Sequence, residues 1–249
     1  MTNGPSAPRL VAATWHLFRR ERELVLAIAL PLIFLPAWAV LLLADPLPPL
    51  PPAPRDEVVL GAWMAAVTAW GQANALWYVL ADAVAIWGVA ALAVLLADPH
   101  RPTVGAALRR SGAWFLSYAA LALLIALPVG AGMWLFVIPG LWAQARFIAA
   151  TPAMAHEGLG VVAALRRSVA LTRGRGLVLT AAVALLFLMQ WCAVVPLASA
   201  DDWLRAPGHE NPLVLALVDA GVAVAGAGFH VAVLLLGVLV YRVGASRGT

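Results

Sequence analysis

The sequence predicts an all-α polytopic membrane protein, with six transmembrane helices and further amphipathic helices at the membrane surface. Hydrophobic types make up 63% of the 249 residues, and charged types make up only 11%. Soluble domains carry about 25% charged residues, so this composition excludes a water-soluble enzyme. It also excludes intrinsic disorder, which requires low hydrophobicity. The third observation is the arrangement of the apolar residues, which form long stretches separated by arginine-containing segments.

The lengths of these stretches predict the spans, because a spanning helix needs about 20 apolar residues. The stretch Gly112–Ala155 would make a helix of about 66 Å at ~1.5 Å per residue, which is twice the thickness of the ~30 Å hydrocarbon core. Residues 128–132 (Pro-Val-Gly-Ala-Gly) form a turn signal inside it, so we expect a hairpin there. The six expected spans are residues 24–44, 75–96, 112–127, 133–154, 177–199 and 213–241.

The arginine positions predict the orientation, since cytoplasmic loops are enriched in basic residues. With six spans and the N-terminus inside, thirteen Arg lie on the cytoplasmic side, Arg55 and Arg205 lie outside, and Arg146 lies in the membrane. A single crossing by Gly112–Ala155 would give eight against seven, and two crossings by Val58–Ala97 would give ten against five. We therefore expect a multi-pass protein with both termini in the cytoplasm.

Four segments are predicted to be helices at the membrane surface, and three of them are basic. Such helices lie in the headgroup plane and attract anionic lipid, so the expected partner is the bilayer itself. The four segments are residues 10–22, 57–71, 103–110 and 159–173. The expected headgroup contacts are Arg19, Arg20, Arg109, Arg110, Arg166, Arg167 and Arg173.

The segment 57–71 is apolar and belongs to the outer side of the membrane in this topology. Trp63, Trp70 and Trp77 recur every seven residues, which places them on one helical face. Trp favours the membrane interface, so we expect this segment on or dipping into the outer leaflet. The alternative is that the three indoles pack against neighbouring helices.

Two of the basic segments share a sequence. Val104–Ser111 and Val161–Ser168 are identical at seven of eight positions, at an offset of 57 residues. We hypothesise three units, residues 9–97, 101–155 and 158–241, each a basic helix followed by two spans. Internal repeats are common in transport proteins. The alternative is chance similarity in a chain rich in Ala, Leu and Arg.

A longer pattern resembles a known family. It consists of Ile138-Pro139-Gly140, Arg146, Pro152, Glu157-Gly158 and then Ala164-Leu165, Ser168, Leu171-Thr172 and Gly174. It resembles the membrane domain attached to some bacterial glycerophosphoryl diester phosphodiesterases, which also occurs alone in multi-pass proteins of unknown function. The resemblance implies an integral protein of the bacterial inner (plasma) membrane. It implies no activity, because the catalytic phosphodiesterase domain is a separate soluble domain.

Polar side chains inside the predicted spans are the candidate functional residues, because such groups are costly in a bilayer. We expect Arg146 to face the bundle interior and to pair with Asp82 or Asp219. Such a pair is either part of a transport route or a structural bridge that fixes helix register. Gln144, Gln190, Asn74 and His230 complete the set.

No catalytic residue, metal site or cofactor is predicted. The segment His156–Gly160 begins like the zinc motif H-E-x-x-H, but it has Gly where the second His is required. Nucleic acid is not an expected partner, because the Arg positions follow the membrane topology. The favoured function is a non-enzymatic envelope or membrane-homeostasis component with a basic cytoplasmic face.

Other functions stay open. One is a small transporter or lipid-handling protein that uses Arg146 with Asp82 or Asp219. An intramembrane enzyme is the weakest alternative, because no nucleophile and base lie close together in the sequence. A protein partner or a homo-oligomer is also compatible with the sequence.

Overall fold

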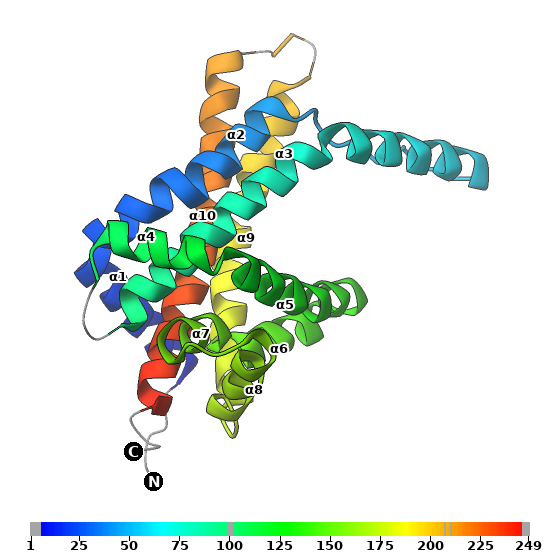
Figure 1. Ribbon diagram of the computed structural model, residues 1–249. Coiled ribbons are helices and arrows are strands. Elements are labelled where there is room, and N and C mark those ends of the chain that lie inside the picture. Colours follow the sequence, from blue (N-terminus) through cyan, green and yellow to red (C-terminus); the bar gives the residue numbers. More distant parts are fainter. Residues whose placement is uncertain (1–5, 99–101, 207, 210, 246–249) are drawn as a thin grey trace.

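The computed structural model describes residues 6–98, 102–206, 208–209 and 211–245, and every regular element in these residues is helical. This confirms the prediction of an all-α fold (Figure 1). The elements are α1 (Ala7–Ala29), the π-helical segment η1 (Leu30–Phe34), α2 (Leu35–Leu43), α3 (Glu57–Ala97), α4 (Val104–Ala113), α5 (Phe115–Leu135), α6 (Val137–Phe147), α7 (Ala150–Glu157), α8 (Val161–Leu171), α9 (Gly176–Leu204) and α10 (Pro212–Ala245).

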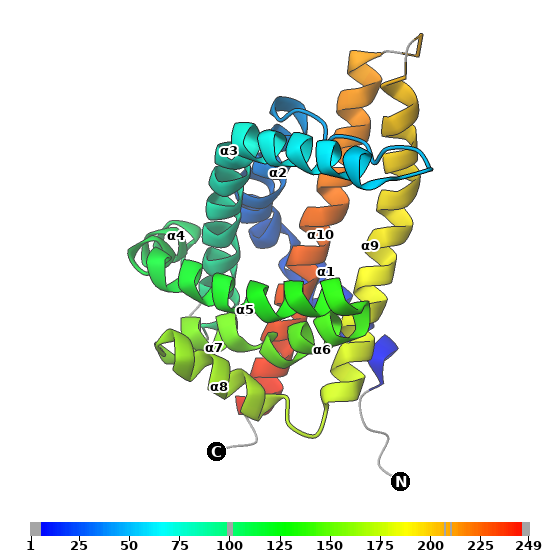
Figure 2. The ribbon, with the colours of Figure 1, turned by 90° about the vertical axis from the view of Figure 1, so that its right-hand side faces the viewer.

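Four long segments run along the axis of a bundle. They are the joined α1–η1–α2 segment, the second part of α3, α9 and α10 (Figures 1 and 2). The start of α1 and the end of α10 lie at the same end of this bundle. In the described part of the chain, five helical segments are long and apolar enough to cross a membrane: Ala7–Leu43, Glu57–Ala97, Phe115–Leu135, Gly176–Leu204 and Pro212–Ala245.

The expected fourth span, residues 133–154, is not one helix. Its residues are divided among the end of α5, the short helix α6 and the start of α7. Pro139 and Pro152 are the third residues of α6 and α7, where the missing N–H of proline breaks no helical hydrogen bond. With 11 residues, α6 is about 16 Å long, which is too short to cross a ~30 Å hydrocarbon core.

The turn expected at residues 128–132 is also displaced. Helix α5 continues through Pro128 to Leu135, and the chain reverses at Phe136 instead. The glycines allow two helices to approach, because a Cβ on Gly132 would lie 2.6 Å from the backbone nitrogen of Gly140. The resulting α5–α6 hairpin lies across the bundle rather than along it (Figure 2).

The expected surface segments 10–22 and 57–71 are continuous with the helices that follow them. Residues 10–22 lie in α1, which has a kink at Glu21 (φ −106°, ψ 16°). Residues 57–71 are the first part of α3, which points away from the bundle as an arm (Figures 1 and 2). The other two segments correspond to α4 and α8.

A proline-rich segment, residues 44–56, connects α2 to this arm. Trp63 Nε1 donates a hydrogen bond to the carbonyl oxygen of Pro48 (3.2 Å), and Trp70 Nε1 donates to that of Asp45 (2.7 Å). Asn74 Oδ1 accepts from the backbone N–H of Asp45 (3.0 Å). Two of the three predicted interface tryptophans therefore bind the proline-rich segment with their polar edges.

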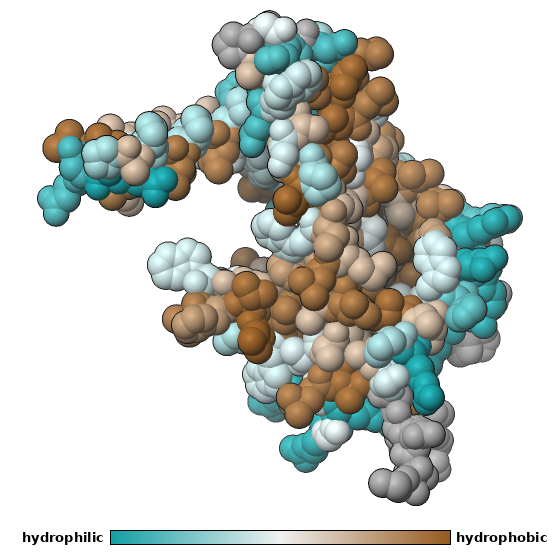
Figure 3. Space-filling model, turned by 180° about the vertical axis from the view of Figure 1, so that it is seen from behind, coloured by the Kyte–Doolittle hydropathy of each residue, from teal (hydrophilic) through white to brown (hydrophobic). Residues whose placement is uncertain are grey.

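The core is built around the C-terminal half of α10. One buried cluster joins α10 to α1, η1 and α3, and a second joins it to α6 and α9. Close approaches occur at two glycines. A Cβ on Gly88 would lie 2.8 Å from Leu32 Cβ, and one on Gly237 would lie 2.2 Å from the carbonyl oxygen of Ile148. In Figure 3, hydrophobic side chains cover much of the middle of the molecule between its two ends. Hydrophilic side chains gather at the side where α1 and α4 lie.

Candidate lipid-headgroup site

The predicted intramembrane pair does not form. The Arg146 guanidinium donates a hydrogen bond to the carbonyl oxygen of Val169 on α8 (3.1 Å) and lies 5.9 Å from the ring centre of Trp142. Asp219 is buried near Arg205, with 3.9 Å between Oδ1 and Nη2. Asp82 is exposed and forms no hydrogen bond or ion pair with any described residue. Arg146 therefore joins two neighbouring helices and has no carboxylate partner among these residues.

The remaining polar candidates lie apart from one another. His230 is exposed, and its Nδ1 lies 2.9 Å from the carbonyl oxygen of Gly226 in the same helix. Gln144 is half-buried in α6. At the other end of the bundle, a hydrogen bond to Asp201 (2.9 Å) raises the pKa of Arg205 above its usual value and outweighs the opposing effect of burial. These residues share no site in the described structure.

The three basic helices, in contrast, share one arrangement. Each buries two residues that are four apart and so lie on one helical face. These are Leu17 and Glu21 in α1, Ala107 and Ser111 in α4, and Ala164 and Ser168 in α8, all 7% exposed or less. The arginine pair of each helix lies between the two buried positions in sequence and turns away from the core. A buried face on one side of each helix and arginines on the other are what the amphipathic pattern predicts.

In each helix the second arginine forms an ion pair within the protein. Arg20 pairs with Glu21 (3.0 Å), Arg110 with Asp98 (3.3 Å) and Arg167 with Glu157 (2.9 Å). Asp98 and Glu157 stand at the ends of the helices α3 and α7, which precede α4 and α8. These ion pairs therefore fix two of the basic helices to the preceding parts of the chain.

The first arginine of each pair differs from the second in its contacts. Arg19, Arg109 and Arg166 are exposed, and within the described ranges none of them forms a hydrogen bond or ion pair. Arg173, beyond the end of α8, is exposed as well. The headgroup contacts expected from the sequence thus divide into outward-facing groups and groups that bind carboxylates. Arg101 and Arg247, which belong to the cytoplasmic count, lie outside the described residues.

The repeat extends to these helices but not to the hairpins that follow them. Helices α5 and α6 have 21 and 11 residues, whereas α9 and α10 have 29 and 34. The first pair lies across the bundle and the second runs along it (Figure 2). The hypothesis of three equivalent units is not confirmed, and the shared feature is the basic helix.

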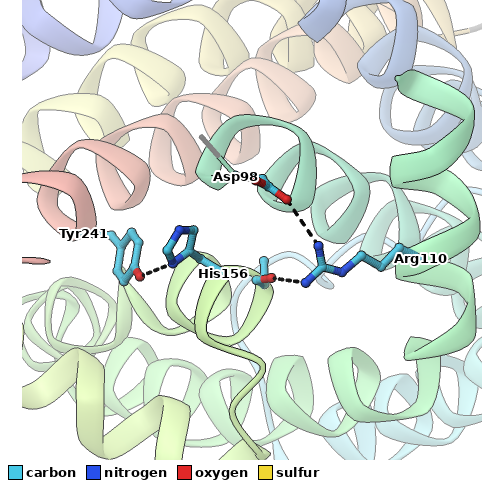
Figure 4. Close-up of polar contacts among 5 residues, drawn as sticks. Asp98, Arg110, His156 and Tyr241 are labelled. Atoms are coloured by element: carbon cyan, nitrogen blue, oxygen red, sulfur yellow. Dashed lines mark hydrogen bonds and ion pairs between the residues drawn. The ribbon is translucent and has the colours of Figure 1, made fainter. Parts of the chain in front are cut away.

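A polar contact network lies where α3, α4, α7 and α10 meet (Figure 4). Arg110 also donates to the carbonyl oxygen of Ala155 (3.3 Å), and His156 Nδ1 lies 2.7 Å from the hydroxyl of the buried Tyr241. A cavity of about 300 Å³ adjoins His156, Tyr241 and Arg242. The described residues contain no group of three or more side chains suited to a metal ion.

Sequence reasoning missed this network, and there was little signal for it. His156 and Tyr241 are 85 residues apart in the sequence. The sequence pattern singled out His156 only as the first residue of the incomplete zinc motif. Their hydrogen bond fastens α7 to α10 at the end where the basic helices lie.

No protein-family model, curated protein or solved structure matches the chain. The resemblance to the phosphodiesterase membrane domain therefore stays a prediction.

Proposed function

We propose that this chain is a non-enzymatic component of the bacterial inner membrane, whose basic cytoplasmic face binds anionic phospholipid headgroups. The single observation that supports this function is the common geometry of the three basic helices. Each buries one face and leaves the first arginine of its pair, Arg19, Arg109 or Arg166, exposed without a protein partner among the described residues. Exposed arginines near a membrane attract anionic lipid by about 1 kcal/mol each.

The proposal includes a membrane topology of four crossings, by the α1–α2 segment, α3, α9 and α10. The α5–α6 hairpin enters the cytoplasmic leaflet and returns to the same side, since α6 is too short to span. Its exposed apolar residues, such as Leu116 (82% exposed) and Ile138 (74% exposed), suit a lipid environment. The arginine distribution fits four crossings as well as six, because a hairpin that enters and returns leaves the same loops inside.

The transporter alternative has less support than the lipid-binding function. It relied on Arg146 meeting Asp82 or Asp219, and Arg146 instead binds the backbone of α8. No described contact favours a transport route over the lipid-binding function.

The test is lipid selectivity of the reconstituted protein. Spin-labelled phosphatidylglycerol and phosphatidylcholine in vesicles report which lipid the protein retains at its surface. We expect the wild type to prefer phosphatidylglycerol and the triple variant R19Q/R109Q/R166Q to lose most of that preference. The triple Lys variant at the same positions keeps the charge and should keep the preference. Equal retention of both lipids by the wild type would refute the function.

A further inference from the structure

An apolar crevice lies between α1, α9 and α10, apart from the polar network described above. Its lining includes Leu10 and Ala13 of α1, Val178 of α9 and Val243 of α10, and its volume is about 150 Å³. Among the described residues that line it, Arg175, the residue before α9, carries the single charged side chain, and none of them carries a carboxylate.

The positive charge at this crevice comes from more than one group. Arg9 lies four residues before Ala13, so both stand on the same face of α1. Helix α9 begins at Gly176, and no side chain caps its first N–H groups. The N-terminal end of a helix carries a partial positive charge. Arg175 is half-buried and so is held at the crevice rather than extended into solvent.

The approach to Arg175 is open. Gly174 has φ +77°, and a Cβ placed on it would meet nothing within 4 Å. A Cβ on Gly176 would meet a single atom, Trp142 Nε1, at 3.9 Å. The residues on both sides of Arg175 therefore carry no side chain that could cover it.

We propose that this crevice is a specific site for one anionic glycerophospholipid, with an acyl chain between α1, α9 and α10 and the phosphate on Arg175. The inference rests on the proposed function, which places this end of the bundle at the cytoplasmic headgroups. Charge complementarity selects the occupant, because an apolar crevice beside the Arg175 guanidinium matches a molecule with an apolar chain and a phosphate. A free phosphate matches only half of the site.

Retention of lipid by the purified full-length protein tests this site. Native mass spectrometry counts the lipids retained from detergent micelles that contain phosphatidylglycerol or phosphatidylcholine with the same acyl chains. We expect one phosphatidylglycerol to survive conditions that remove the others. Its retention should fall at least fivefold in R175Q, which removes the charge, and in A13L, which fills the crevice.

Two controls separate the site from the general basic face. R22Q removes an exposed arginine of α1 that does not line the crevice and should leave the retained lipid in place, and R175K should retain more lipid than R175Q. Melting temperatures measured by tryptophan fluorescence should be unchanged in A13L and R175Q, which establishes that both remain folded. If A13L has a lower melting temperature than the wild type, R175Q alone decides the result.

The outcomes distinguish the two proposals. Equal losses in R22Q and R175Q, or unchanged retention in both A13L and R175Q, would overturn the crevice while the basic face still binds lipid. Displacement by sn-glycerol 3-phosphate at the concentration of phosphatidylglycerol would overturn the acyl-chain part. A wild type that retains both lipids equally, here and in vesicles, would overturn the proposed function as well.

Discussion

The hydroxyl of Ser168 joins the two backbone groups that flank the break after Arg146. It donates a hydrogen bond to the carbonyl oxygen of Arg146 (2.8 Å) and accepts one from the N–H of Ala149 (3.1 Å). Groups at helix ends have no partner within the helix, and leaving them unpaired in a buried place is costly. Ser168 is fully buried, so it stabilises the interruption between α6 and α7.

Replacement of Ser168 by Ala should therefore destabilise the protein. It leaves the buried N–H of Ala149 without its partner, and it leaves the carbonyl oxygen of Arg146 with only a longer hydrogen bond from the hydroxyl of Thr172 (3.4 Å). An unsatisfied buried group costs about 1–3 kcal/mol. The matched control is S111A at the equivalent position of the repeat, where the hydroxyl donates only to Leu108 within its own helix (3.0 Å). The free energy of unfolding in detergent and SDS mixtures measures both. Equal losses of unfolding free energy in S168A and S111A would show that the hydrogen bonds of Ser168 across the break do not stabilise the protein.

The close approach of α10 to the same break predicts a second effect. A methyl group on Gly237 would lie 2.2 Å from the carbonyl oxygen of Ile148, so G237A must push α10 away from the α6–α7 break. Overpacking of this kind costs about 1–3 kcal/mol. Unfolding in the same detergent and SDS mixtures measures this loss.

Gly226 provides the control for that substitution in the same helix. A Cβ there meets nothing within 4 Å, and Ala has the higher helix propensity. G226A should leave stability unchanged or raise it slightly. A G237A protein as stable as G226A would mean that α10 does not lie against the break.

The tryptophans of the α3 arm predict a local effect on proteolysis. Trp70 Nε1 binds the carbonyl oxygen of Asp45 (2.7 Å), so W70F removes a donor that holds the start of the proline-rich segment. We expect faster cleavage in residues 44–56, located by mass spectrometry, with little change in global stability. W77F is the control, because Trp77 is exposed and forms no hydrogen bond with a described residue. Identical cleavage in both variants would contradict the role of Trp70.

The sequence predicted the helical class and the long apolar helices, because both follow from composition and from one-dimensional periodicity. It could not predict the path of the chain through residues 112–155. The count of arginines on each side depends only on whether a segment crosses an odd or even number of times. Two crossings by this segment, or none, give the same count.

The candidate site was predicted less well than the fold. The arginine pairs were visible in the sequence, but which member faces outward depends on tertiary contacts. Arg110 reaches Asp98 across a connection, and Arg167 reaches Glu157 in the same way. Arg146 was expected to need a carboxylate, whereas the carbonyl oxygen of Val169 became available where α8 passes the interrupted segment.

The topology gives the last prediction, because the two paths of residues 112–155 place the α5–α6 turn on opposite sides of the membrane. In six crossings this turn faces outward, and in four crossings it stays in the cytoplasmic half. Cys192 is the single cysteine and is exposed, so C192S provides a background for the substitution F136C.

A membrane-impermeant maleimide added to intact cells should therefore leave F136C unlabelled. H209C, in the connection between α9 and α10, is the external control and should react. E23C, in α1 just after the kink, should react only after the cells are opened. Labelling of F136C in intact cells at the rate of H209C would require the hairpin to cross, since a turn that returns within the cytoplasmic leaflet never reaches the outer solution.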